Sequence, residues 1–100
     1  MKLYIDTSSS EKITVGIDNE KFETAAKEKT SQKLLPFIDE ILKKKGKTPK
    51  DITEIEVATG PGSFTGLRVG VAVANTLGWV LKIPVNGEDI LKKGSVDIIY

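Results

Sequence analysis

A glycine-rich loop carries the strongest chemical signal in the sequence. Three glycines and a proline stand between a β-like run at 55–59 and a helix-like run at 67–81. Because glycine tolerates positive φ and proline fixes φ, a strand can turn abruptly into a helix here. The first N–H groups of that helix can then hold an anion, or they can be capped by Ser63 or Thr65. The loop consists of Gly60, Pro61, Gly62, Ser63, Phe64, Thr65 and Gly66.

Two nucleotide-binding motifs fail to match this loop. The phosphate loop of nucleotide hydrolases has a lysine directly after its second glycine, whereas Leu67 stands at that place. The dinucleotide fingerprint needs its last glycine one residue earlier than Gly66. A loop that simply reverses the chain is the structural alternative to a ligand site.

The composition limits the classes of function. The chain has 100 residues, a formal net charge of +1, no cysteine and no histidine. It is long enough for one domain, and its charge gives no reason to expect autonomous nucleic-acid binding. Disulfides, zinc–thiolate sites, histidine bases and histidine-ligated metals are excluded. No continuous apolar run reaches the roughly 18 residues of a membrane span, so we expect a cytoplasmic protein without membrane contact.

The hydrophobic pattern predicts an α/β fold. Alternating apolar residues predict strands at 2–6 and 12–17, with a weaker edge strand at 22–26 beyond a tight turn at Asp18-Asn19. A helix capped by Thr30 and Ser31 should follow, ending in a cationic turn before Gly46. Pro36 requires this helix to begin close before it or to be distorted there.

The second half of the chain should complete a mixed five-stranded sheet. We expect a short helical turn at 48–51, a strand at 55–59, a helix at about 63–81 and a strand at 83–85. A further helical turn at 88–93 and a β-like end at 96–100 should follow. Each helical crossover implies parallel neighbouring strands.

The predicted helix at 63–81 has an unusual stripe of small residues at every fourth position: Gly66, Gly70, Ala74 and Gly78. Each glycine costs helix stability, which suggests that close packing compensates. With the sheet on the valine side, the stripe would receive a helix of a second subunit and complete a four-helix bundle. Alternatively, the first helix of this chain fills the groove. Arg68 and Asn75 are seven residues apart and would form a polar rim.

Three motifs together resemble one known family. The string GPGSFTGLRVG at 60–70 closely resembles the signature of the TsaB (YeaZ) family. LYIDTS at 3–8 is similar to the opening strand of that family, and SQKLLP at 31–36 is similar to its first-helix motif. The position before Ser31, commonly histidine in the family, is Thr30. The chain has about half the family's usual length, so the resemblance predicts a single lobe over 1–100 with the second lobe absent.

This resemblance implies a ribonuclease H-like lobe, as in actin and the sugar kinases, and a role as a non-catalytic partner. In the family the two helices bind TsaD, the subunit that makes N6-threonylcarbamoyladenosine on transfer RNA, or a second copy of TsaB. Together with the rim residues, the resemblance assigns this interface to Leu34, Leu35, Ile38, Ile41, Leu42, Gly66, Leu67, Arg68, Gly70, Val71, Ala74 and Asn75.

Asp6, Thr7 and Ser8 occupy the place of a phosphate loop in nucleotide-binding relatives, but the glycine of that loop is missing. Asp6 could bind Mg²⁺ through water, or these side chains could make local turn hydrogen bonds. The lysines between Lys43 and Lys50 could complement the helix dipole or touch transfer RNA within a larger complex.

We therefore expect an adaptor that is not itself an enzyme. It would bind a TsaD-type subunit, meet transfer RNA only indirectly and hold no cofactor alone, with ATP and Mg²⁺ bound only in the full complex. Two alternatives remain: a nucleotide-binding lobe or nucleotide-dependent enzyme using Asp6 and the 60–66 loop, and a homodimeric interaction domain.

Overall fold

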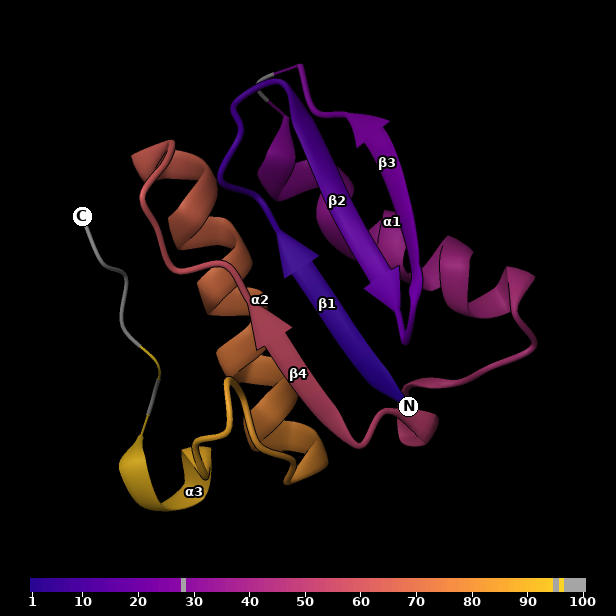
Figure 1. The fold of residues 1–100 in the computed structure, drawn as a ribbon, viewed down its shortest axis with the longest axis vertical. Helices are drawn as coiled ribbons and strands as arrows, with labels where there is room; N and C mark the ends of the chain where they lie inside the picture. The colour runs from indigo at the N-terminus through magenta and orange to yellow at the C-terminus, as the bar shows by residue number, and fades with distance from the viewer. Residues whose placement is uncertain (28, 95, 97–100) are drawn as a thin grey trace.

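In the computed structural model, which describes residues 1–27, 29–94 and 96, two helices pack on one side of a sheet (Figure 1). Both long helices lie behind the strands in this view. The elements are β1 (Lys2–Asp6), β2 (Lys12–Ile17), β3 (Glu20–Ala25), α1 (Thr30–Lys44), a 3₁₀ turn (Pro49–Asp51), β4 (Glu54–Val57), α2 (Phe64–Leu81) and α3 (Ile90–Lys93).

The sheet has the order β3-β2-β1-β4 and is mixed, as the sequence predicts. β1 pairs antiparallel with β2 and parallel with β4, so that Leu3 lies opposite both Ile17 and Ile55. Alternate residues of β1 and β4 are buried, because only one face of the sheet is covered by helices. The expected turn at Asp18-Asn19 is confirmed, and it places β3 at the edge.

The described residues contain four strands, so the expectation of five is wrong. Val85 makes isolated bridges, a parallel one with Ile55 and an antiparallel one with Glu88, and belongs to no strand. The strand cannot continue because Asn86 and Gly87, both at positive φ, turn the chain back at once, and Val85 and Glu88 exchange two backbone hydrogen bonds. Residues 97–100 of the predicted β-like end lie outside the described residues.

Helix α1 begins differently from the prediction and ends as predicted. Its N-cap is Lys29, which makes no side-chain capping bond; Thr30 and Ser31 are instead its first two residues. Pro36 lies inside the helix. At the other end Gly46 has φ of +68°, and the amide of Lys47 donates to the carbonyl of Leu42 at 2.8 Å. The cationic end therefore closes in a Schellman motif.

Helix α2 presents its small-residue stripe to the sheet. A Cβ at Gly66 would overlap the carbonyl oxygen of Thr7, and one at Gly78 would lie 2.5 Å from the Val85 side chain. The expectation that the sheet takes the valine side is therefore wrong, because only the small residues allow so close an approach. By length and composition alone α2 could cross a membrane, but its buried residues are the ones that face the sheet.

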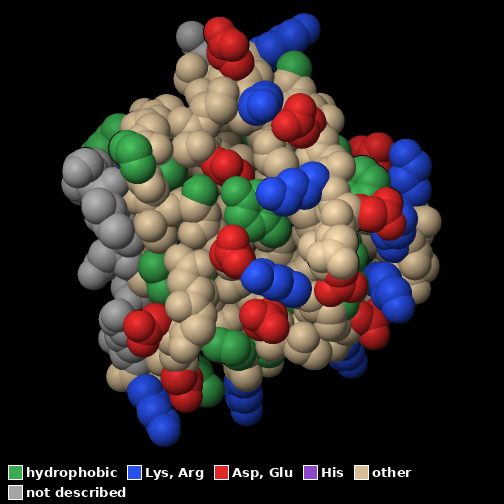
Figure 2. Space-filling model, in the orientation of Figure 1, with side chains coloured by type: hydrophobic (Ala, Val, Ile, Leu, Met, Phe, Trp, Pro, Cys, Tyr) green, Lys and Arg blue, Asp and Glu red, His purple; other side chains and the backbone are tan. Residues whose placement is uncertain are grey.

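The other face of the sheet carries charged side chains (Figure 2). Lys2 forms an ion pair with Glu56 at 2.5 Å, and Lys12 one with Glu23 at 3.2 Å. The ammonium group of Lys21 lies 4.6 Å from the centre of the Tyr4 ring. The hydrophobic core therefore lies between the sheet and the two long helices, and the functional features described below gather around those helices.

Candidate functional site

The glycine-rich loop fastens α2 to the end of β1. Ser63 is the N-cap of α2 and its hydroxyl accepts from the amide of Gly66 at 3.3 Å, which confirms one of the two expected caps. The amide of Ser63 donates to the carbonyl of Ser8 at 2.7 Å. Thr7, which is fully buried, donates its hydroxyl hydrogen to the carbonyl of Gly66 at 2.5 Å.

Close approach explains why glycines occupy this loop. Gly60 and Gly62 have φ of 134° and 158°, which side chains rarely adopt. A Cβ at Gly62 would lie 2.7 Å from both the Cβ and the carbonyl oxygen of Ser8. These glycines let the loop pass directly over the β1–β2 connection. Their role in backbone geometry therefore has a structural basis.

In the candidate phosphate loop, from Asp6 to Ser8, the polar side chains hydrogen-bond within the chain. The Asp6 carboxylate accepts from the amide of Ser8 at 2.9 Å, from the Ser8 hydroxyl at 2.6 Å and from the Tyr4 hydroxyl at 3.1 Å. Burial raises the pKa of this carboxyl group, but the hydrogen bonds from Ser8 and Tyr4 outweigh it, so the pKa lies below its usual value. The pKa of the Tyr4 hydroxyl is raised by burial and by the charge of Asp6.

Most of the residues expected at a partner interface are core residues. Helix α1 buries four apolar side chains against the sheet, and the stripe of α2 is buried as described above. The buried members are Leu34, Ile38, Ile41, Leu42, Gly66, Leu67, Gly70, Val71 and Ala74. This part of the expected interface is wrong, because each helix turns its most continuous apolar stripe toward its own sheet.

Three of the expected interface residues retain exposed surface. Leu35 is 53% exposed, and Arg68 is exposed with its guanidinium group over the Phe64 ring at 5.4 Å. Asn75 is half-buried and pairs with the backbone of Val96, donating at 3.0 Å and accepting at 2.9 Å. Its expected place in a polar rim is therefore taken by a contact within the chain.

A shallow apolar groove runs between α1 and α2. It has a volume of about 270 Å³ and is lined by Leu35 from α1 and by Ala72, Val73, Thr76 and Leu77 from α2. Sequence reasoning missed the α2 residues, although Val73 and Leu77 are four apart and share one helical side. One turn further along α2, Trp79 and Val80 are 57% and 65% exposed. These seven residues are called the α1–α2 face below.

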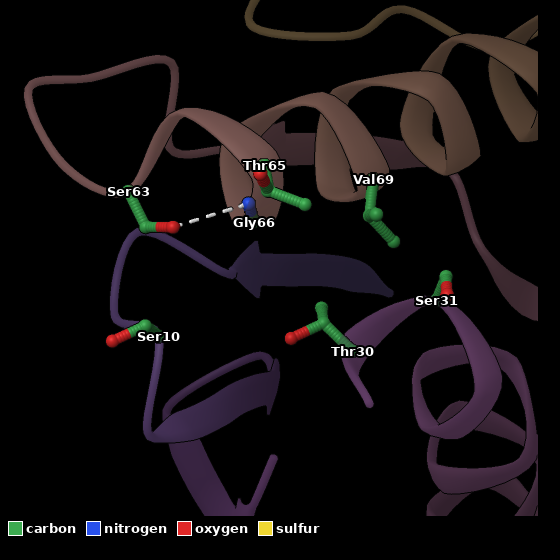
Figure 3. A pocket seen from close by; sticks show the side chains of 7 residues that line it. All are labelled: Ser10, Thr30, Ser31, Ser63, Thr65, Gly66 and Val69. Atoms are coloured by element: carbon green, nitrogen blue, oxygen red, sulfur yellow. Dashed lines mark hydrogen bonds between the residues drawn. The ribbon is translucent and has the colours of Figure 1, made fainter. Parts of the chain in front are cut away.

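A second hollow lies at the N-terminal ends of the same helices (Figure 3). It has a volume of about 380 Å³, and hydroxyl side chains from three separate segments surround it. It includes three residues of the signature loop. The lining residues are Ser10, Thr30, Ser31, Ser63, Thr65, Gly66 and Val69. Among the described residues, no group of three or more His, Cys, Asp or Glu side chains could hold a metal ion.

Comparison with known proteins assigns the family. The family model described as "TsaD: tRNA N6-adenosine threonylcarbamoyltransferase" matches residues 22–91. The chain belongs to the TsaB (YeaZ) family within this group. It is 39% identical over 69 residues to the Bacillus subtilis tRNA threonylcarbamoyladenosine biosynthesis protein TsaB, covering 69% of this chain and 30% of that protein. For the Escherichia coli TsaB protein, identity is 37% over 76% of this chain and 32% of that protein.

The same assignment follows from the fold. YeaZ from Pseudomonas aeruginosa superposes with a TM-score of 0.72 and 27% identity, over 84% of this chain and 42% of that one. The chain therefore has an α/β actin-like fold and spans about a third of the length of the curated TsaB proteins that it matches. TsaB homologues associate this fold with the formation of threonylcarbamoyladenosine on transfer RNA.

Proposed function

We propose that this chain is a non-catalytic adaptor that binds a TsaD-type subunit through the α1–α2 face and so supports threonylcarbamoyl transfer to transfer RNA. The observation that carries the proposal is the exposed apolar groove between α1 and α2, in a chain that belongs to the TsaB family. Exposed apolar surface of this kind is typical of protein–protein contacts.

The residues of the face suit an interface. Leu35 and Val80 offer aliphatic surface, and Trp79 is an aromatic side chain of the type that dominates binding energy. Ala72 and Thr76 are small and exposed, so a helix of the partner can approach α2 closely between them. A four-helix arrangement with two helices from each subunit fits this geometry.

The proposal assigns catalysis to the partner. The sequence holds no histidine or cysteine to act as base or nucleophile. Asp6, the acidic residue of the candidate phosphate loop, already accepts three hydrogen bonds within the chain. In this proposal ATP and Mg²⁺ bind only in the full complex, and the chain contacts transfer RNA only indirectly. The protein acts in the cytoplasm.

Binding to a TsaD-type subunit, measured by isothermal titration calorimetry, tests the proposal. Leu35→Asp should weaken binding about 10- to 100-fold, since a charge placed in an apolar contact costs on the order of 1.4–2.8 kcal/mol. Leu91→Asp is the matched control, because Leu91 is 47% exposed on α3, away from the groove. The control should bind as the original chain does.

The outcomes separate the alternatives. Equal binding by the original chain and Leu35→Asp would contradict the assignment of the face. If the chain does not bind TsaD and instead self-associates in a way that Leu35→Asp abolishes, the homodimeric interaction domain would be favoured. ATP hydrolysis by the pure chain, lost in Asp6→Ala, would favour the nucleotide-dependent enzyme.

A further inference from the structure

A single charge marks the exposed side of α2. Arg68 is the one charged side chain among the 18 residues of this helix. It is exposed and stands four residues before Ala72, which stands four residues before Thr76 of the groove. Residues four apart lie on the same side of a helix, so Arg68 lies in line with the α1–α2 face, at its N-terminal end.

No contact within the described residues neutralises this charge. No carboxylate among them forms an ion pair with Arg68. Arg68 lies in the second turn of α2, near the end at which the helix dipole disfavours cations, so the charge does not stabilise its own helix. Its place on this helix is therefore better explained by a group outside the chain.

The guanidinium group is held in position by an aromatic ring. It lies 5.4 Å from the centre of the Phe64 ring, and Phe64 is itself 51% exposed. An arginine on an aromatic side chain, both open to solvent, has the composition that is enriched in protein–protein interfaces. The contact orients Arg68 before any partner binds, which lowers the entropic cost of the interaction.

A second copy of this chain complements Arg68 poorly. Its α2 offers no acidic side chain. On α1, Asp39 follows Leu35 by four residues and so lies on the same side of the helix, but its carboxylate already pairs with Lys43 at 2.9 Å. A partner that brings a carboxylate of its own fits the charge of this surface better.

We propose that Arg68 binds a carboxylate of the TsaD-type subunit, an Asp or Glu side chain on the helix that lies along the α1–α2 face. This inference rests on the adaptor function proposed above and adds the chemistry of the contact. Arginine can donate two parallel hydrogen bonds to a carboxylate, so the pair fixes the direction in which the partner helix lies.

The length of the surface defines the partner helix further. From Arg68 to Val80 the axis of α2 rises about 18 Å, at about 1.5 Å per residue. The partner helix therefore needs an acidic side chain at one end and about three turns of apolar side chains beyond it. A helix with its acidic residue at the other end would place a carboxylate among Leu77, Trp79 and Val80.

Isothermal titration calorimetry with the TsaD-type subunit at two salt concentrations tests the inference. Arg68→Met keeps an apolar stem and removes the charge, so it should bind about tenfold more weakly at low salt. At high salt the difference from the original chain should shrink to about twofold or less, because salt screens an exposed charge pair. Lys92→Met, which removes an exposed cation from α3, is the matched control and should bind as the original chain does.

Reversal of the charge identifies the partner group. Arg68→Glu should bind more weakly than Arg68→Met at low salt, because two carboxylates would then face each other. Both variants should keep the melting temperature of the original chain, since Arg68 is exposed and forms no ion pair within the described residues. Equal binding by Arg68→Glu and Arg68→Met would overturn the assignment of a carboxylate.

The remaining outcomes separate this inference from the adaptor proposal. If Leu35→Asp weakens binding and Arg68→Met does not, the adaptor proposal stands and the inference about Arg68 is wrong. If neither substitution weakens binding, the α1–α2 face is not the docking surface and both are wrong. Self-association that Arg68→Glu abolishes and a second substitution, Asp39→Lys, restores would show that a second copy supplies the carboxylate, which also overturns the inference.

Discussion

At the scale of single residues, Thr7 joins the first strand to the second helix. Its buried hydroxyl group donates to the carbonyl of Gly66, and a Cβ at Gly70 would overlap the oxygen of the same hydroxyl group. The glycines of α2 and the threonine after β1 therefore fit each other. The cost of glycine in a helix, about 1 kcal/mol each relative to alanine, is offset by this close packing.

Gly70→Ala tests this fit. Alanine is the better helix former, yet the added methyl group would collide with Thr7, so the free energy of unfolding should fall by about 1–3 kcal/mol in urea denaturation. The double variant with Thr7→Ala should lose less than the sum of the two single losses, because the collision is partly removed. Strict additivity would contradict the proposed contact.

The Asp6 carboxylate should make stability depend on pH in the acid range. Its pKa in the folded chain is below the ordinary value of 3.8. As the pH falls, the Asp6 carboxylate therefore takes up a proton in the unfolded chain before it does so in the folded chain. The stabilisation that is present above about pH 4 is lost as the pH falls through the pKa of the folded chain. Thermal melts between pH 2 and pH 7 should show this loss in the original chain.

Asp6→Asn should lower the melting temperature at pH 7 and flatten its dependence on acid pH. Asp39→Asn serves as the charge-matched control, because Asp39 is exposed on α1 and, among the described residues, forms its ion pair with Lys43 at 2.9 Å. An acid dependence that survives unchanged in Asp6→Asn would show that other carboxylates cause it.

At the scale of elements, the sequence predicts a helix, strand or turn well where the residues of that one segment determine its structure. Alternation predicts β1 and β2, and the Asp18-Asn19 turn follows from residues that tolerate positive φ. The start and end of α2 also follow from Ser63 and the apolar run. The Asn86-Gly87 pair is a strong signal for a tight hairpin turn, and it explains why no fifth strand forms after Pro84.

Which face of a helix packs inward depends on more than the helix itself. The stripe from Gly66 to Gly78 shows that something approaches α2 closely, but the identity of that neighbour depends on Thr7 and Val85, which are far away in the sequence. The pocket is unpredictable for the same reason, since Ser10, Thr30 and Ser63 meet only in the folded chain. Periodicity identifies an apolar stripe and leaves its partner open.

Gly46→Ala tests the end of α1. Gly46 has φ of +68° and nothing within 4 Å of an added Cβ, so only the backbone conformation opposes a side chain there. The substitution should cost about 1 kcal/mol, which corresponds to a fall in melting temperature of about 4–8 °C for a domain of this size. Asn tolerates this conformation better, so Gly46→Asn should lose less; equal losses would contradict the backbone explanation.

At the scale of the whole molecule, packing and recognition use different sides of the same two helices. The inward sides of α1 and α2 hold the sheet, whereas the surface between them stays open as an apolar groove. The hydroxyl-lined pocket at the N-terminal ends is a third, separate surface. Substitutions in the groove should therefore alter association without unfolding the chain.

Trp79 can report on that association directly. It is the sole tryptophan of the sequence, is 57% exposed, and lies one helical turn beyond Thr76 of the groove. Binding of a partner to the α1–α2 face should remove water from the indole ring and shift its fluorescence emission to shorter wavelength. The emission of the complex that the Trp79→Phe variant forms with the partner is subtracted from that of the original complex. This removes the contribution of the partner's own tryptophans.

The shift should saturate at the stoichiometry found by sedimentation and persist in Leu91→Asp, whereas Leu35→Asp should need about 10- to 100-fold more partner to reach the same shift. Leu35 and Trp79 lie on different helices, so their joint response requires one partner that covers both. Unchanged emission from Trp79 in a complex that sedimentation shows to be intact would place the contact elsewhere on the molecule. In that case the groove between α1 and α2 would not be the docking surface, even if the chain binds a TsaD-type subunit.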